Sequence, residues 1–148
     1  MPHAGLMDEN ALGPLKGPLQ RARLHLRGGK RRLAQGKISA GIVTLYDAVE
    51  AAMESYTAVA EHRAALKVKA GENINESKKH YTALVRAGVL DGTFDFVEFD
   101  RLTERALNEE LPDFDYRPLL ASVERVLREL EILPFNEGLL PPEDPKTY

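Results

Sequence analysis

The chain has 148 residues, of which 43% are hydrophobic and 29% are charged, with no cysteine and a net charge of −3. This size and balance are typical of one globular domain with its own hydrophobic core, and they exclude an intrinsically disordered chain. The lack of cysteine excludes disulfides, zinc–thiolate sites and thiol nucleophiles.

The N-terminal residues 1–13 are interpreted as a loose tail. They lack the basic and then apolar pattern, so we expect no secretory signal. Near the expected core, the longest uncharged run covers residues 38–46. It is far shorter than the ~20 residues that a membrane-spanning helix needs. We therefore expect a cytoplasmic protein that does not enter a membrane.

A first helix is predicted from residue 14 onwards, since apolar residues recur every three or four positions from Leu15 to Leu33. Gly29 falls on this apolar face, which suggests a close backbone contact there. Gly36 is the expected C-cap.

The next segment, from Ser39 to Leu66, is predicted to be one long helix with Ser39 as its N-cap. Bulky apolar residues recur at heptad spacing along one face, and a stripe of small residues runs beside them. The candidate helix–helix or dimer contacts on this stripe are Gly41, Ala48, Ala51, Ser55, Ala58 and His62. A helix that is apolar or small around most of its circumference needs more than one neighbour. We therefore expect this long second helix to be central and mostly buried.

Two further helix starts are predicted at Asn73 and Asp95, because each is followed by a glutamate three residues later, the spacing of a capping box. Phe94 and Phe99 are placed to pack against each other across the second start. A last helix is predicted to open near Pro118.

The predicted fold is therefore all-α, an up-and-down helical bundle of four to five helices. It forms a single domain over residues 14–133, followed by a Pro-rich extended tail over residues 134–148.

The first helix carries a strongly basic flank, while residues 91–115 hold nine acidic and two basic residues. The candidate nucleic-acid or anion contacts on the basic flank of the first helix are Arg21, Arg23, Arg27, Lys30, Arg31 and Arg32. Such a flank can follow a phosphate backbone, but no aromatic residue is interleaved for base stacking. In the alternative interpretation, which we prefer, the flank faces an acidic arc of the second helix. That arc consists of Asp47, Glu50, Glu54 and Glu61.

No catalytic, metal-binding or cofactor-binding motif is predicted. The four histidines, His3, His25, His62 and His80, form no metal-binding spacing, and phosphate-loop and nucleophile-elbow patterns are missing. Asp95 and Glu98 are explained by helix capping rather than by a cation site. His62 is interpreted as a core histidine, and an enzyme that uses His62 or His80 in a pocket is the least favoured hypothesis.

The stretches "GKISAGIVTLYDAVEAAMESY", "LVRAGVLDGTF" and "DFDYRPLLASVERVLREL" resemble the HEPN superfamily of small helical bundles. The resemblance covers residues 15–133 and implies the same helix order. Many members of that superfamily carry an Arg-x4–6-His motif that cuts RNA at a dimer interface. This sequence lacks the motif, so the resemblance implies a non-catalytic member that binds partners or nucleotides.

We therefore expect a non-enzymatic helical bundle that acts through protein–protein contacts, as a homodimer or beside a partner chain. The alternative is an RNA- or nucleotide-binding module that uses the basic first helix. The tail segment "LLPPEDP" is either a peptide that docks on a neighbouring subunit or a frayed terminus, and we prefer the second.

Overall fold

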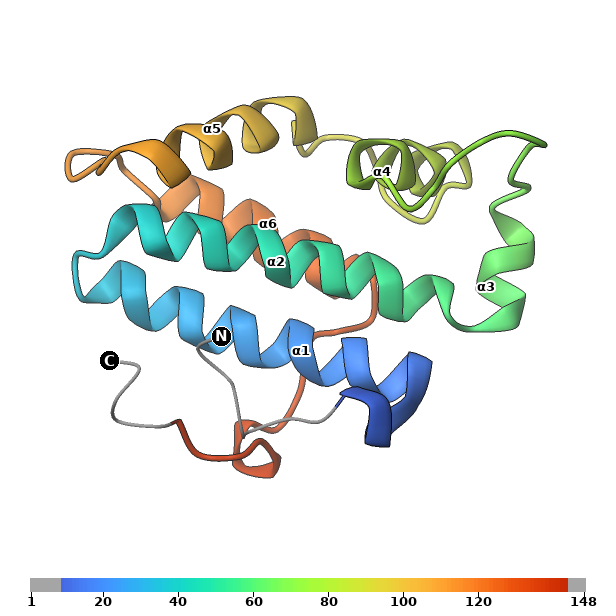
Figure 1. Ribbon diagram of the computed structural model, residues 1–148, viewed down its shortest axis with the longest axis horizontal. Helices are drawn as coiled ribbons and strands as arrows, with labels where there is room; N and C mark the ends of the chain where they lie inside the picture. Colours follow the sequence, from blue (N-terminus) through green and yellow to red (C-terminus); the bar gives the residue numbers. More distant parts are fainter. Residues whose placement is uncertain (1–8, 144–148) are drawn as a thin grey trace.

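The computed structural model describes residues 9–143, with side chains from residue 12. Over these residues it contains six α-helices, one short 3-10 helix and no strand (Figure 1), which confirms the predicted all-α class. The elements are α1 (Glu9–Ala34), α2 (Ile38–Thr57), α3 (Ala60–Ala65), α4 (Ser77–Arg86), α5 (Phe96–Asn108), α6 (Arg117–Glu129) and η1 (Glu137–Leu139). None of the helices in this part of the chain combines the length and the hydropathy needed to cross a membrane.

The predicted N-terminal tail falls partly outside the described residues, which begin at residue 9. Residues 9–12 already belong to α1, and Gly13, with φ of 87°, breaks the helix before it continues. At the other end of α1, Gly36 occupies the tight turn to α2 with φ of 79°. This is the left-handed backbone that the predicted C-cap glycine supplies.

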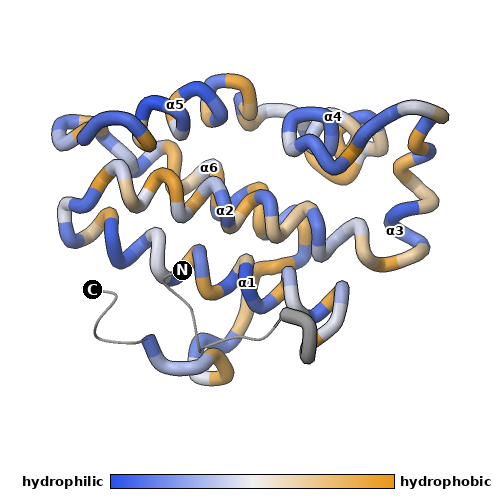
Figure 2. The backbone as a smooth tube through the Cα atoms, in the orientation of Figure 1, coloured by the Kyte–Doolittle hydropathy of each residue, from blue (hydrophilic) through white to orange (hydrophobic). Residues whose placement is uncertain are grey.

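The second helix is central, as expected. Thirteen of the twenty residues of α2 are buried, because α1, α5 and α6 all pack against it. Apolar residues recur along α2, whereas hydrophilic residues are frequent along α5 (Figure 2). The small residues of α2 let α1 approach closely, and the two helices form an antiparallel hairpin along most of their length.

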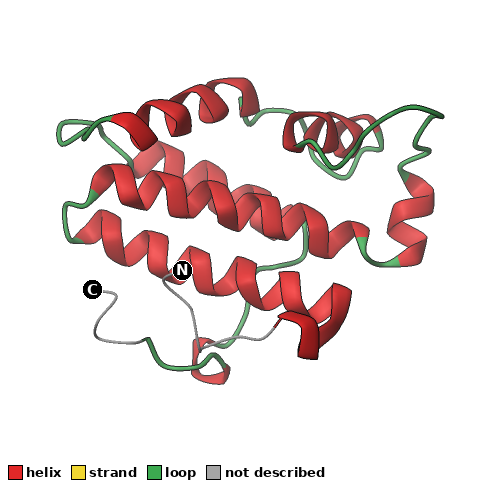
Figure 3. Ribbon diagram, in the orientation of Figure 1, coloured by secondary structure: helices red, strands yellow, loops and turns green. Residues whose placement is uncertain are grey.

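The predicted long helix over Ser39–Leu66 is interrupted. Val59 is extended (ψ of 124°), and α3 turns away from the axis of α2 after a short loop (Figure 3). None of the six residues of α3 is buried, whereas Leu66 directly after it is almost completely buried. A continued helix would carry Leu66 away from the core. The break returns this side chain to the core, and it accounts for one helix beyond the predicted four to five.

The last helix opens near Pro118 as predicted, since α6 begins at Arg117. Of the three predicted N-cap residues, two are wrong and one is confirmed. Ser39 lies inside α2, whose N-cap position is Lys37. Asn73 closes a local turn by accepting a hydrogen bond from the backbone of Asn75, and α4 begins four residues later. Asp95 caps α5 as predicted, since its side chain accepts a hydrogen bond from the backbone nitrogen of Glu98 at 3.0 Å.

An aromatic cluster fixes α5 against α2 and α4. Tyr81 of α4 stacks on Phe96 with ring centroids 5.1 Å apart, and its hydroxyl donates to the carbonyl oxygen of Phe94. Phe94 packs edge-on against Phe99 at 5.3 Å, as the sequence predicts, and Tyr46 of α2 contacts Phe99 at the same centroid distance. These contacts hold α5 beside α2. A cleft opens between the two helices, along the C-terminal part of α5.

Candidate interaction surfaces

A cleft of about 630 Å³ lies between α2 and α5, and His25 of α1 also lines it. This volume is in the usual range for pockets that bind small molecules or anchor side chains of a partner. Val43 and Thr44 of α2 contribute apolar atoms to one wall, and Leu107 stands at the opposite wall. Leu107 is 68% exposed. A large apolar side chain so open to water beside a cleft is typical of a contact surface.

The cleft is acidic. Four carboxylates line it, namely Asp47, Glu50, Asp100 and Glu104. They come from two helices that are about 50 residues apart in sequence, and only the packing of α5 on α2 brings them together. Within the described residues, no group of three or more such side chains has the arrangement of a metal site.

Three of these carboxylates have partners in the described part of the chain, and Asp47 and Asp100 are two of them. The side chain of Asp47 lies 2.8 Å from Nε2 of His25 and 3.5 Å from a guanidinium nitrogen of Arg21. The hydroxyl of Tyr46 donates to Asp100 at 2.8 Å. Burial raises the pKa of Tyr46, and the hydrogen bond to Asp100 raises it further. Tyr46 therefore stays a protonated donor beside the acidic group.

Glu50 is half-buried and accepts a hydrogen bond from the hydroxyl of Ser77. Burial raises the pKa of Glu50, and the charges of Asp47 and Asp100 act in the same direction, while the Ser77 hydrogen bond opposes them. The contributions of Asp47 and Asp100 to this shift have the sign of repulsion between like charges. The cleft is chemically suited to an aliphatic group that carries a positive charge.

The basic flank of α1 is divided among three neighbours. Arg21 faces Asp47 and Glu54 of α2 at 3.5 and 3.8 Å, which is the contact expected from the acidic arc. Lys30 lies 3.6 Å from Glu124 of α6. Arg32 is buried.

The remaining three arginines of the flank contact residues 132–143. Arg23 donates to the carbonyl oxygen of Ile132, and both Arg27 and Arg31 bind the carboxylate of Glu143. We call residues 134–143 the strap; it runs along α1 on the side away from α2 in the view of Figure 1. This contact was not predicted from the sequence. The acidic pair at positions 143 and 144, directly after two prolines, was the available signal.

The small-residue stripe of the predicted second helix is partly buried. Its first four candidate contacts lie in α2, and the last two lie after the end of α2. Gly41, Ala48, Ala51 and Ser55 are buried within the chain. Gly41 lies against Leu33 of α1. Ala58 is exposed, and the half-buried His62 stacks on Tyr56 with ring centroids 3.9 Å apart.

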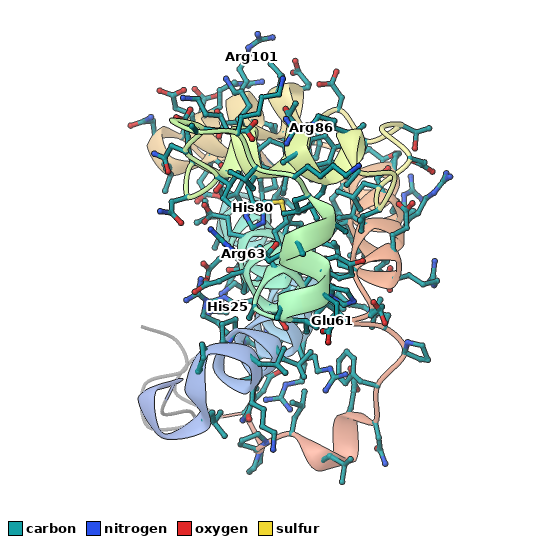
Figure 4. All side chains as sticks on the ribbon, turned by 90° about the vertical axis from the view of Figure 1, so that its right-hand side faces the viewer. His25, Glu61, Arg63, His80, Arg86 and Arg101 are labelled. Atoms are coloured by element: carbon teal, nitrogen blue, oxygen red, sulfur yellow. The ribbon has the colours of Figure 1, made fainter. Side chains whose placement is uncertain are left out.

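His80 is buried, and its Nε2 is hydrogen-bonded to the hydroxyl of Thr57 at 2.7 Å. A small pocket of about 190 Å³ beside this pair is also lined by Arg63. Figure 4 shows His80 and Arg63 at the end of the molecule that carries α3. Burial lowers the pKa of His80 to about 4, and the charge of Arg63 adds to the effect. The imidazole is therefore neutral at pH 7.

No model of a known protein family matches the chain, and comparisons with curated proteins and with solved structures also give no significant match.

Proposed function

We propose that the protein is a non-enzymatic helical bundle that binds another protein through the cleft between α2 and α5. The observation that carries the proposal is the position of Leu107, a 68% exposed leucine, beside an apolar cleft lined by four carboxylates. A partner segment that presents an aliphatic side chain next to a lysine or arginine matches both properties. The apolar contact would supply most of the affinity, and the charges would select the partner and speed association.

The resemblance to non-catalytic HEPN proteins belongs to this proposal. An α1–α2 hairpin with a central, small-residue-rich second helix supports the helix order that the resemblance implies. Nucleic-acid binding through the basic flank has less support, because Arg21, Lys30, Arg27 and Arg31 all contact carboxylates of the chain itself.

The test uses two fluorescent amphipathic model peptides, one of leucine and lysine and one of leucine and glutamate, in anisotropy titrations near physiological salt. We expect the lysine peptide to bind at least ten times more tightly than the glutamate peptide. Leu107→Ser should weaken its binding by about tenfold.

The matched control is Leu139→Ser, because Leu139 is also highly exposed but lies on the strap, away from the cleft. It should leave the affinity unchanged. Equal binding of the two peptides, or equal losses in both variants, would contradict the proposal. Sedimentation equilibrium identifies the case in which the partner is a second copy, since self-association would then be lost in Leu107→Ser.

A further inference from the structure

The strap is held on α1 by a shared carboxylate. Nε of Arg27 lies 3.1 Å from one oxygen of Glu143, and Nε of Arg31 contacts the other. The three side chains are only about 15% exposed. Hydrogen bonds between charged groups are about twice as strong as neutral ones, and low exposure reduces their screening by water and salt. This pair of arginines therefore forms a built site for a carboxylate.

Arg23, Arg27 and Arg31, which we call the arginine row, also contact the backbone and an aromatic ring of the strap. Arg27 donates from Nη2 to the carbonyl oxygen of Pro141 at 2.7 Å. One turn earlier on α1, the guanidinium of Arg23 lies over the ring of Phe135, 5.2 Å from its centroid. Arg23, Arg27 and Arg31 are spaced by four residues, so they lie on one side of the helix. Together they contact a ring, a carbonyl group and a carboxylate along one extended segment.

The strap fills this surface incompletely. Leu139 is 83% exposed. A pocket of about 250 Å³ remains between α1 and the strap, lined by Leu12, Leu19 and Arg23 on the α1 side. Leu140 is extended, with φ of −84° and ψ of 150°, a conformation that an independent peptide rich in proline also adopts. The contacts that Glu143 and Pro141 make with α1 are polar ones that another extended peptide can reproduce.

A carboxylate beside Arg27 and Arg31 offsets the repulsion between their positive charges. Like charges four residues apart on a helix repel each other. Burial lowers the pKa of Arg32, the charge of Arg31 lowers it further, and Glu143 acts in the opposite direction. Removing the carboxylate of Glu143 from this position would leave the positive charges of the row without that compensation.

We propose that Arg23, Arg27 and Arg31 form a docking site for an extended acidic peptide of a partner protein, and that the strap is the intramolecular competitor for this site. The site is separate from the α2–α5 cleft. A tethered competitor has a high effective concentration, so the site is closed in the isolated chain and opens when the strap is weakened or outcompeted.

The test uses the full-length chain and a labelled peptide with the strap's own sequence, FNEGLLPPE (residues 135–143). We expect Glu143→Gln to bind the peptide at least ten times more tightly than the unchanged chain, because the competitor has lost its carboxylate. Phe135→Ala, which weakens the strap at its other anchor, should act in the same direction. A control peptide with glutamine in place of its last glutamate should bind at least ten times more weakly than the original.

Specific variants locate the site. Adding Arg27→Gln to Glu143→Gln should abolish the gain, whereas adding Lys37→Gln, a basic residue in the turn after α1, should preserve it. The proposal is overturned if the unchanged chain and both weakened-strap variants bind equally, or if the control peptide binds as well as the original. It is also overturned if a single-stranded oligonucleotide binds Glu143→Gln more tightly than the peptide, because the row would then be a phosphate-binding surface.

Discussion

Gly41 of α2 lies directly against Leu33 of α1. A Cβ atom placed on Gly41 would be 2.6 Å from both Cγ and Cδ2 of Leu33, and 3.2 Å from its backbone nitrogen. The contact is reciprocated one turn away, where a Cβ on Gly29 of α1 would be 2.8 Å from Cδ2 of Leu45. The two helix backbones approach so closely at these points that no side chain fits between them.

We predict that Gly41→Ala destabilises the protein by ~1–3 kcal/mol, the usual cost of overpacking a buried contact. Alanine favours a helix over glycine by about 1 kcal/mol, so a loss of stability would have the opposite sign to the propensity effect. The urea midpoint of unfolding, followed by circular dichroism, measures the change.

Gly28→Ala is the matched control. The atom nearest to its added Cβ is Nη1 of Arg32 at 2.9 Å, the end of a flexible side chain that can move. We expect unchanged stability or a gain of up to ~1 kcal/mol. If both alanine variants shifted the midpoint equally, the close approach at Gly41 would not be the cause.

Much of the hairpin could be predicted from the sequence, because its determinants are local. Gly36 readily adopts the left-handed conformation that the turn needs. The small residues of α2 permit a neighbouring helix to approach closely. The end of α2 could not be predicted in this way. The residues after Thr57 still favour a helix, and only the burial of Leu66 in the assembled core explains the break.

The candidate surfaces depended even more on tertiary packing. Asp100 and Glu104 look like an ordinary solvated helix face in the sequence, and they become part of an acidic cleft only because α5 packs beside Glu50. The strap contact joins Arg27 and Glu143, which are more than 100 residues apart, and no local periodicity encodes such a pair.

The capping of α5 provides a second prediction. Asp95→Ala removes the acceptor for the backbone N–H of Glu98 and should destabilise the protein by about 1 kcal/mol. Asp95→Asn keeps an oxygen in the same place and should retain most of the stability. Asp113→Ala changes an exposed aspartate in the loop before α6 and should stay within ~0.5 kcal/mol of the unchanged chain. Equal losses in the alanine and asparagine variants at position 95 would rule out capping as the mechanism.

The third prediction concerns pH and His80. In the folded chain burial lowers the pKa of this side chain to about 4, whereas in the unfolded chain it returns to about 6.5. Between these pH values the unfolded chain binds a proton that the folded chain does not. The stability from neutral His80 is therefore complete above pH ~6.5 and is lost as the pH falls towards 4. We expect a loss of about 2 kcal/mol at pH 5 relative to pH 7.5 from this group alone.

His80→Asn isolates that contribution, because the variant has no imidazole to protonate at this position. Urea unfolding of both proteins at a series of pH values should give a smaller loss between pH 7.5 and 5 in the variant, whatever its stability at neutral pH. Arg63→Gln should also reduce the loss, since the charge of Arg63 contributes to the lowered pKa of His80. If the unchanged chain and His80→Asn lost stability in parallel over this range, His80 would not be held neutral by its burial beside Thr57.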